Sequence, residues 1–222
     1  MNTFKQPARG FTLVELAMSL LVIGLLMGTL ILPVTGQFNA RAIDETVKTM
    51  ENIKEALIGY AMTNNKLPCP AAVVSNPAVN DLGTSQSTLC GQEGFLPWAE
   101  LGIGKVTDAW GFPIRYRVDN AYTTAIPTDL KASSNISVSR DTGSGNVNLV
   151  SAEPDGTSKI IVLLLSYGND HTPNGTNTDG DTNYISNEYM NGSFDDIVMW
   201  LPKTTLLARL AAANRYNYST SP

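Results

Sequence analysis

The chain has 222 residues, of which 43% are hydrophobic and 16% are charged, and its formal net charge is −5. This length suits one domain, with or without a long appended helix, and the hydrophobic fraction excludes a disordered chain. Because no basic stripe is present, the composition argues against a nucleic acid as the main partner.

The first ten residues form a short, polar and positively charged segment. Lys5 and Arg9 precede an apolar run over residues 11–32, and a helix of about 20 such residues is long enough to span a bilayer. Basic residues in front of such a run place the leader in the cytoplasm and the rest of the chain outside. We therefore expect a transmembrane segment at 11–32 and an exported domain behind it.

One acidic residue, Glu15, interrupts the apolar run. An ionised carboxylate inside a bilayer costs on the order of 2–3 kcal/mol and indicates a function with a specific partner. The α-amino group of Phe11 would be that partner if cleavage made Phe11 the new terminus. The alternative is a carboxylate that reaches the membrane interface near the end of the helix.

Residues 10–16, Gly-Phe-Thr-Leu-Val-Glu-Leu, resemble the cleavage and methylation motif of type IV prepilins and type II secretion pseudopilins. The resemblance implies that a prepilin peptidase cuts between Gly10 and Phe11 and then methylates the Phe11 amine. It also implies that Glu15 meets the Phe11 amine of an adjacent subunit during assembly.

Two further positions of the same stretch, Gly24 and Pro33, match helix-loosening positions of the family, with Pro33 one residue later than usual. Both residues weaken the backbone ladder of a helix, which fits local melting on packing into a filament. The sequence Ala-Arg-Ala at 40–42 resembles a signal-peptidase site instead, which would release a soluble domain. We reject this alternative because the apolar run exceeds the roughly 7–15 residues of a signal peptide and leaves Glu15 unexplained.

An amphipathic pattern predicts that the helix continues beyond Pro33 to about residue 65. Apolar residues recur there at steps of three and four, and polar residues occupy the other face. The apolar positions are Ile43, Val47, Met50, Ile53, Leu57, Ile58 and Ala61. We therefore expect a leader over 1–10, a long helix over 11–65 and a globular head over 66–222.

Short strands separated by loops are predicted in the head. The apolar patterns indicate strands over 114–118, 135–139, 159–166 and 196–200, and a C-terminal helix over 204–214. Because 159–166 is apolar throughout, we expect a central strand buried on both faces. The class is α+β. The resemblance implies the pilin fold, in which a half-transmembrane, half-amphipathic helix packs on a small antiparallel sheet within a loop-rich head.

Cys69 and Cys90 are the two cysteines of the chain. Outside the cytoplasm a pair of cysteines is most simply a disulfide, which would stabilise the fold by about 3 kcal/mol. Two buried free thiols are the alternative.

A second resemblance lies in the head. Residues 108–116 are similar to the D-x-W-G-x-P-x-x-Y stretch of the major pseudopilin of type II secretion. Residues 166–170, followed by 193–200, resemble the calcium loop and last strand of that family. Trp110 and Trp200 would then be core aromatics.

The resemblance implies a bound calcium ion, which takes six to eight oxygen ligands. Carried over to this chain, it implies Asp170 and Asp195 as carboxylate ligands, with Ser193 and the backbone carbonyl of Tyr167 as weaker candidates. A longer insertion over 171–192 separates the two halves of this site and departs from the family.

The insertion has acidic residues of its own at the spacing of an EF-hand loop. They are weaker calcium candidates, because Thr182 stands where that loop needs glycine, and a solvated polar loop is the alternative. The candidates are Asp179, Asp181 and Glu188, interleaved with Asn177 and Asn183.

No catalytic arrangement accompanies His171, the one histidine of the chain. Its surroundings lack a nucleophile elbow, and the chain has neither a phosphate-binding glycine loop nor a zinc-ligand spacing. We therefore predict a structural protein and not an enzyme.

The predicted function is that of a filament subunit, in a type IV pilus-like fibre or a type II secretion pseudopilus. Its partners would be other pilins, prepilin peptidase, an inner-membrane assembly platform and membrane lipid before assembly. We expect the precursor in the bacterial inner membrane and the product in a periplasmic pseudopilus or cell-surface pilus. The alternative is a scarce minor pilin that binds a ligand at the tip through loops 66–94 or 171–192.

Overall fold

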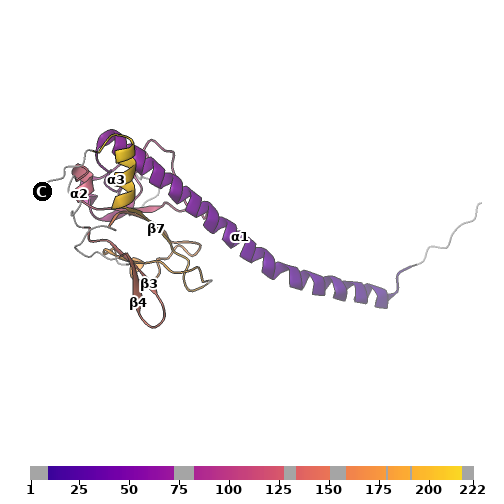
Figure 1. Cartoon of the computed structure of the whole chain (residues 1–222). Coiled ribbons are helices and arrows are strands. Elements are labelled where there is room, and N and C mark those ends of the chain that lie inside the picture. The colour runs from indigo at the N-terminus through magenta and orange to yellow at the C-terminus, as the bar shows by residue number, and fades with distance from the viewer. Residues whose placement is uncertain are drawn as a thin grey trace, which may run out of the picture. The chain divides into compact units, whose positions relative to one another are not determined.

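The computed structural model describes residues 10–72, 83–127, 134–150, 159–178, 180–190 and 192–216, without the side chains of 28–37 and 178. The chain forms two compact units, Met1–Arg41 and Ala42–Pro222. Helix α1 (Leu13–Asn64) contributes its first part to one unit and its second part to the other (Figure 1).

Local capping explains where α1 begins and ends. The backbone N–H of Glu15 donates to Thr12 Oγ1 at 3.3 Å, so Thr12 has the role of an N-cap. At the other end, Asn65 has a φ of 54° and its N–H donates to the carbonyl of Ala61 at 2.9 Å. Asparagine tolerates this left-handed conformation, which ends the helix. The predicted long N-terminal helix is confirmed.

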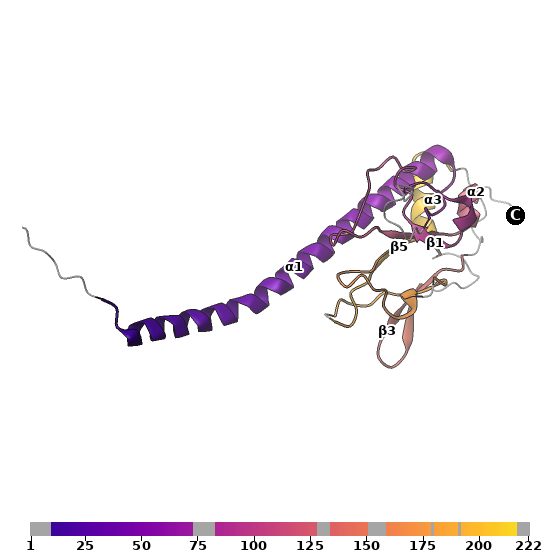
Figure 2. The same cartoon turned by 180° about the vertical axis from the view of Figure 1, so that it is seen from behind.

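A four-stranded antiparallel sheet forms the centre of the second unit (Figure 2). Its strand order is β1 (Glu93–Phe95), β2 (Arg115–Val118), β5 (Ile160–Ser166) and β7 (Ile197–Pro202). All residues of β5 are buried, and the strand pairs with β2 on one side and β7 on the other. The prediction of a central strand buried on both faces is confirmed.

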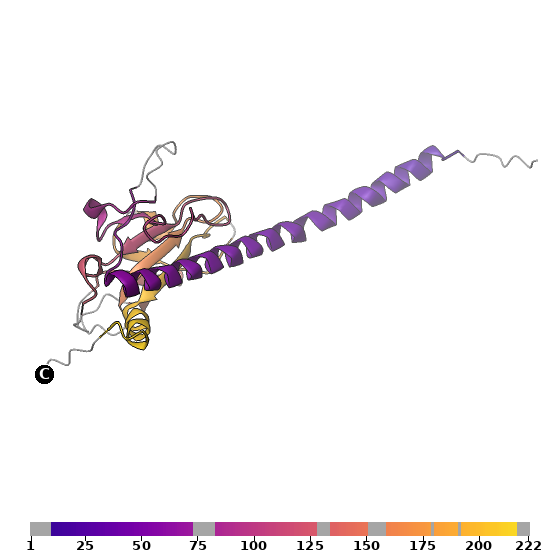
Figure 3. The same ribbon diagram turned by 90° about the horizontal axis from the view of Figure 1, so that it is seen from above.

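Helices cover one face of this sheet. The second part of α1 lies beside α3 (Lys203–Ala212), as Figure 3 shows. Met50 and Leu57 of α1 share a buried cluster with Leu206 of α3 and with Tyr116 and Leu164 of the sheet. The steps of three and four in the sequence therefore mark the face of α1 that packs on the sheet.

A second, three-stranded sheet packs on alternate residues of β5. It has the order β4 (Asn146–Val150), β3 (Ser137–Asp141) and β6 (Asn183–Ile185), and β3 and β6 run parallel. Val138 and Tyr184 share a cluster with Leu163 and Leu165 of β5. Leu164, in contrast, belongs to the buried cluster that β5 forms with α1 and α3. Because neighbouring residues of a strand point to opposite faces, the small sheet and the helices sandwich β5.

This second sheet differs from the sequence prediction of one small antiparallel sheet. The difference has a local cause, since β6 lies inside the polar insertion and consists of Asn-Tyr-Ile, which has no readable alternation. The remaining elements are single turns: η1 (Ser87–Leu89), α2 (Ala121–Thr124) and η2 (Gly175–Thr178).

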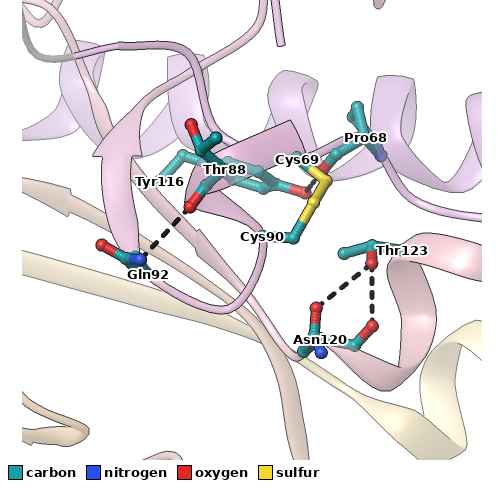
Figure 4. The surroundings of a disulfide bond; sticks show 8 residues. All are labelled: Pro68, Cys69, Thr88, Cys90, Gln92, Tyr116, Asn120 and Thr123. Carbon is teal, nitrogen blue, oxygen red and sulfur yellow. Dashed lines mark hydrogen bonds between the residues drawn. A yellow bond between two sulfur atoms is a disulfide. The ribbon is translucent and has the colours of Figure 1, made fainter. Parts of the chain in front are cut away.

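The predicted disulfide joins Cys69 to Cys90, with their Cα atoms 4.7 Å apart (Figure 4). Nearby, Tyr116 donates its hydroxyl to the carbonyl of Pro68 at 2.9 Å, and Gln92 donates its amide to the carbonyl of Thr88 at 3.2 Å. The bridge therefore holds the segment after α1 against the approach to β1.

Candidate processing and cation sites

The predicted cleavage point lies in an open segment. Gly10 is exposed, and a Cβ added there would meet nothing within 4 Å. Phe11 is 81% exposed, and the helix begins only at Leu13. The Gly10–Phe11 peptide bond is therefore exposed and lies outside the helix, as access by a peptidase requires. Leader residues 1–9 lie outside the described part of the chain.

The first part of α1 exposes its apolar residues. Side chains from Leu13 to Met27 have large exposed fractions, for example 85% at Leu13 and 69% at Leu25. Glu15 is exposed within this surface. At Gly24, an added Cβ would meet nothing within 4 Å. Pro33 lies within α1, but its side chain is outside the described residues.

Within the described part of the chain, no helix has the length and apolarity required to cross a membrane. The predicted span over 11–32 is therefore not confirmed, and the side chains of 28–32 are not among those described.

In the head, two adjacent carboxylates lie where the insertion meets β7. Asp195 and Asp196 are 8% and 5% exposed. The backbone N–H of Asp170 donates to Asp195 Oδ2 at 2.9 Å. The carboxylate of Asp170 is exposed and accepts the N–H of Thr172 at 2.8 Å. We call residues 166–177 together with Asp195 and Asp196 the cation loop.

Two asparagines hold these carboxylates in place. Asp196 Oδ2 accepts the backbone N–H of Asn174 and the side-chain amide of Asn177, each at 2.8 Å. Asn174 in turn accepts the backbone N–H of Asp195 at 2.8 Å, and Asn177 exchanges two hydrogen bonds with the backbone of Ile185. The cation loop is therefore anchored to β6.

Each carboxylate also has an oxygen without a partner. Among the described residues, Asp195 Oδ1 and Asp196 Oδ1 are buried and accept no hydrogen bond. Burial is the largest cause that raises the pKa of Asp196, to about 6. The charges of Asp195 and Asp170 raise it further, whereas the hydrogen bonds from Asn174 and Asn177 lower it. Buried carboxylate oxygens without a donor fit a cation with oxygen ligands.

A glycine permits the close packing of this loop. Gly168 has a φ of 64°, and a Cβ added there would lie 2.3 Å from the carbonyl oxygen of Asp195 and 2.7 Å from its carboxylate. Only glycine fits a left-handed position with so little space.

The other expected ligands are placed less favourably. Ser193 is exposed. The side chain of Tyr167 is directed to Glu93, which its hydroxyl contacts at 3.3 Å. Burial, the largest cause, and the Glu93 charge raise the pKa of Tyr167 to about 12. The expected role of its backbone carbonyl stays a prediction. His171, next to Asp170, stacks on Phe112 with ring centroids 3.4 Å apart.

Asp181 and Glu188, the two acidic candidates of the insertion that the structure describes, have different partners. Asp181 accepts the backbone and side-chain N–H groups of Asn183 at 2.6 and 3.1 Å. Glu188 instead lies 3.8 Å from Arg140, and both side chains are exposed. Asp179 lies outside the described residues.

Across the residues that the structure describes, no three His, Cys, Asp or Glu side chains are grouped so as to hold a metal. Any cation at this loop would therefore need amide, hydroxyl, carbonyl or water oxygens besides Asp195 and Asp196. Asp195 was among the candidates predicted from the sequence, whereas Asp196 and Asn174 were not. The Asp-Asp pair at the start of the strand predicted over 196–200 was the available signal for Asp196.

Comparison with protein families gives one match, to the prokaryotic N-terminal methylation motif over residues 5–31. Curated proteins and solved structures gave no match. The motif covers the exposed Gly10–Phe11 bond and the apolar start of α1. The chain therefore carries a prepilin methylation motif, which supports a type IV pilin-like or pseudopilin-like protein that is processed by prepilin peptidase.

Proposed function

We propose that this protein is a structural filament subunit, in a type IV pilus-like fibre or a type II secretion pseudopilus. The observation that carries the proposal is the methylation motif on an exposed apolar helix, joined to a folded head. Large exposed apolar surfaces are stabilised by burial against a membrane or other proteins. In the filament, first parts of α1 from many copies would pack together, and Glu15 would neutralise the Phe11 amine of a neighbour.

Before assembly, the precursor would lie in the bacterial inner membrane. The apolar run over 11–32 and the basic residues Lys5 and Arg9 support a single pass with the head outside the cytoplasm. Its product would be a periplasmic pseudopilus or a surface pilus, assembled with other pilins by an inner-membrane platform.

The first test is the mass of the mature N-terminus. The full chain is co-expressed with a prepilin peptidase, and membrane and sheared-filament fractions are measured by mass spectrometry. We expect a chain that starts at N-methylated Phe11. A chain that starts near Ile43 would instead indicate signal-peptidase cleavage after Ala42 and overturn the proposal.

Two glycine substitutions separate processing from folding. Gly10→Val should leave the chain uncleaved, whereas Gly24→Val should be cleaved as wild type is. The pair is matched because an added Cβ meets nothing within 4 Å at either position. Equal cleavage of both variants would contradict a peptidase site at Gly10.

We further propose that the cation loop binds calcium through Asp195 and Asp196, with Asp170 beside them. The support is the pair of buried carboxylate oxygens that accept no hydrogen bond among the described residues. Calcium would supply a positive charge that offsets the desolvation of both carboxylates.

Calorimetric titration of the full chain in detergent with calcium tests this site. Asp195→Asn should weaken binding by about tenfold or more, since it removes a charged ligand. Asp181→Asn is the control, because its oxygens already accept Asn183, and should change the affinity less than about twofold. Loss of binding only in the Asp181 variant would contradict the proposed site and would indicate that calcium binds near Asp181 instead.

A cavity of about 540 Å³ supports a second function, ligand binding at a filament tip. It is lined by the β3–β4 turn at Thr142, by the insertion residues Asn174, Asn187 and Met190, and by Phe194 beyond the insertion. Quantitative mass spectrometry of sheared filaments distinguishes the two functions, because a bulk subunit is abundant and a tip protein is scarce.

A further inference from the structure

A turn between α1 and the cation loop is held by one buried aspartate. Asp108 is 5% exposed, and its Oδ1 accepts the backbone N–H groups of Trp110 at 3.0 Å and Phe112 at 2.8 Å. These bonds fix the backbone of residues 108–112, which we call the Asp108 turn.

The Asp108 turn contacts the cation loop twice. Ser166 donates its hydroxyl to Asp108 Oδ2 at 2.7 Å and accepts the N–H of Gly168 at 3.2 Å. Gly168 is the residue that packs directly against Asp195. Independently, the Phe112 ring stacks on His171, which follows Asp170. A shift of either contact would move the backbone of residues 166–171, which carries Asp170 and packs against Asp195.

The same turn is also bonded to the long helix. The N–H of Ala109 donates to Thr46 Oγ1 at 3.1 Å, and Thr46 is fully buried in the second part of α1. Thr46, Asp108, Ser166 and Gly168 are all buried, and within the second unit they are linked by these hydrogen bonds and by the backbone of Ala109, which is itself exposed.

We propose that Asp108 and Ser166 are positioning residues for the cation loop, and that the Asp108 turn couples this loop to α1. Occupation of the loop by calcium stabilises the packing of α1 residues 42–64 on the sheet, and this packing in turn strengthens calcium binding, because coupling is reciprocal. The inference rests on the proposed calcium site. Its physical basis is that Thr46, Asp108 and Ser166 are buried, so a missing partner leaves a desolvated group unsatisfied.

Hydrogen exchange of the full chain in detergent, with calcium or with EDTA, tests the coupling. In wild type, calcium should slow exchange both in a peptide covering 166–171 and in one covering 46–57. In Thr46→Val, which keeps the shape of the side chain but removes the acceptor, calcium should still slow exchange in 166–171. Its effect on 46–57 should fall by more than half.

Ser166→Ala should raise the Kd for calcium about fivefold, which corresponds to about 1 kcal/mol. Two hydroxyl variants outside the path are matched controls. Thr63→Val, on the exposed side of α1, and Ser137→Ala, which removes a hydroxyl that donates to Asn183, should leave Kd and both exchange effects unchanged.

The outcomes separate this inference from the calcium proposal. If calcium slows exchange in 166–171 but not in 46–57 of wild type, the site stands and the coupling is wrong. Equal slowing of 46–57 in wild type, Thr46→Val and Ser166→Ala would also overturn the coupling. If calcium changes neither peptide and does not bind in calorimetry, both proposals are wrong.

Discussion

At the scale of single residues, the fold holds Asp196 in a place that opposes its ionisation. Its carboxylate is 5% exposed, two other aspartates lie nearby, and one of its oxygens accepts no bond among the described residues. Two asparagine donors compensate only in part. The arrangement therefore favours either a proton or a cation at this position.

Without divalent cations, the wild-type chain should become less stable relative to Asp196→Asn as the pH rises. The pKa of Asp196 is raised from 3.8 to about 6, so the folded state holds its proton more tightly than the unfolded chain does. The resulting stabilisation is complete below pH 3.8 and is lost as the pH rises through 6. Its full size is on the order of 3 kcal/mol.

Urea unfolding in EDTA at several values between pH 4 and pH 8 measures this effect. The difference in free energy of unfolding between wild type and Asp196→Asn isolates the one carboxylate from the others. A difference that stays constant over this range would contradict a raised pKa at Asp196.

Gly168→Ala should destabilise the head more than a matched glycine substitution does. Gly168 and Gly180 both have left-handed backbones, with φ of 64° and 67°, but an added Cβ collides with Asp195 only at Gly168. We expect Gly180→Ala to cost about 1 kcal/mol and Gly168→Ala about 2 kcal/mol more. Chemical denaturation measures the free energy of unfolding of both variants. Equal losses of stability would mean that the backbone around Gly168 shifts to accommodate the added Cβ.

At the scale of elements, one arginine joins the two sheets. Arg117 of β2 is 6% exposed and donates to the carbonyls of Gly180 and Asp181 at 2.8 and 2.7 Å. It also reaches the hydroxyl of Tyr184 in β6 at 3.3 Å, and this hydroxyl donates to Glu93 of β1 at 2.9 Å. The insertion is thus held through β6 by groups from the central sheet.

Arg117→Met should lower the free energy of unfolding by about 2–4 kcal/mol, because it leaves two carbonyls and a tyrosine hydroxyl without their donor. Arg140→Met is the matched control, because Arg140 is exposed and its ion pair to an exposed Glu188, at 3.8 Å, is weak. This variant should lower the free energy of unfolding by less than about 0.5 kcal/mol. Denaturation curves of both variants give the comparison. Similar losses would show that Arg117 acts only through its charge.

Sequence periodicity predicted the elements that bury a long apolar face. The central strand expected over 159–166 is β5, and the helix expected over 204–214 is α3. The three-residue strand β6 was not predicted, because one tyrosine within a polar loop gives no pattern. The proposed cation site follows the same division. Asp195 was predicted by resemblance, whereas the hydrogen bonds of Asn174 with Asp195 and Asp196 form only once the insertion folds back on β7.

At the scale of the whole molecule, the two units differ in the exposure of their apolar side chains. In the first unit, the described residues from Phe11 to Met27 are exposed, whereas the second unit encloses two buried clusters. The second unit can thus stay folded by its own core, and the first needs a bilayer, a detergent or further copies to cover it. This division fits a subunit whose helix assembles while its head keeps its structure.

If the head folds by its own core, the disulfide should add to its stability without being required for its structure. Replacing Cys69 and Cys90 by alanine removes a bridge between cysteines 21 positions apart in the sequence. The loss of this bridge should lower the free energy of unfolding by about 3 kcal/mol. Urea denaturation measures the loss, and near-ultraviolet circular dichroism should still show packed aromatic residues around Tyr116. A variant that has lost this signal before any urea is added would show that the core alone does not hold the head together.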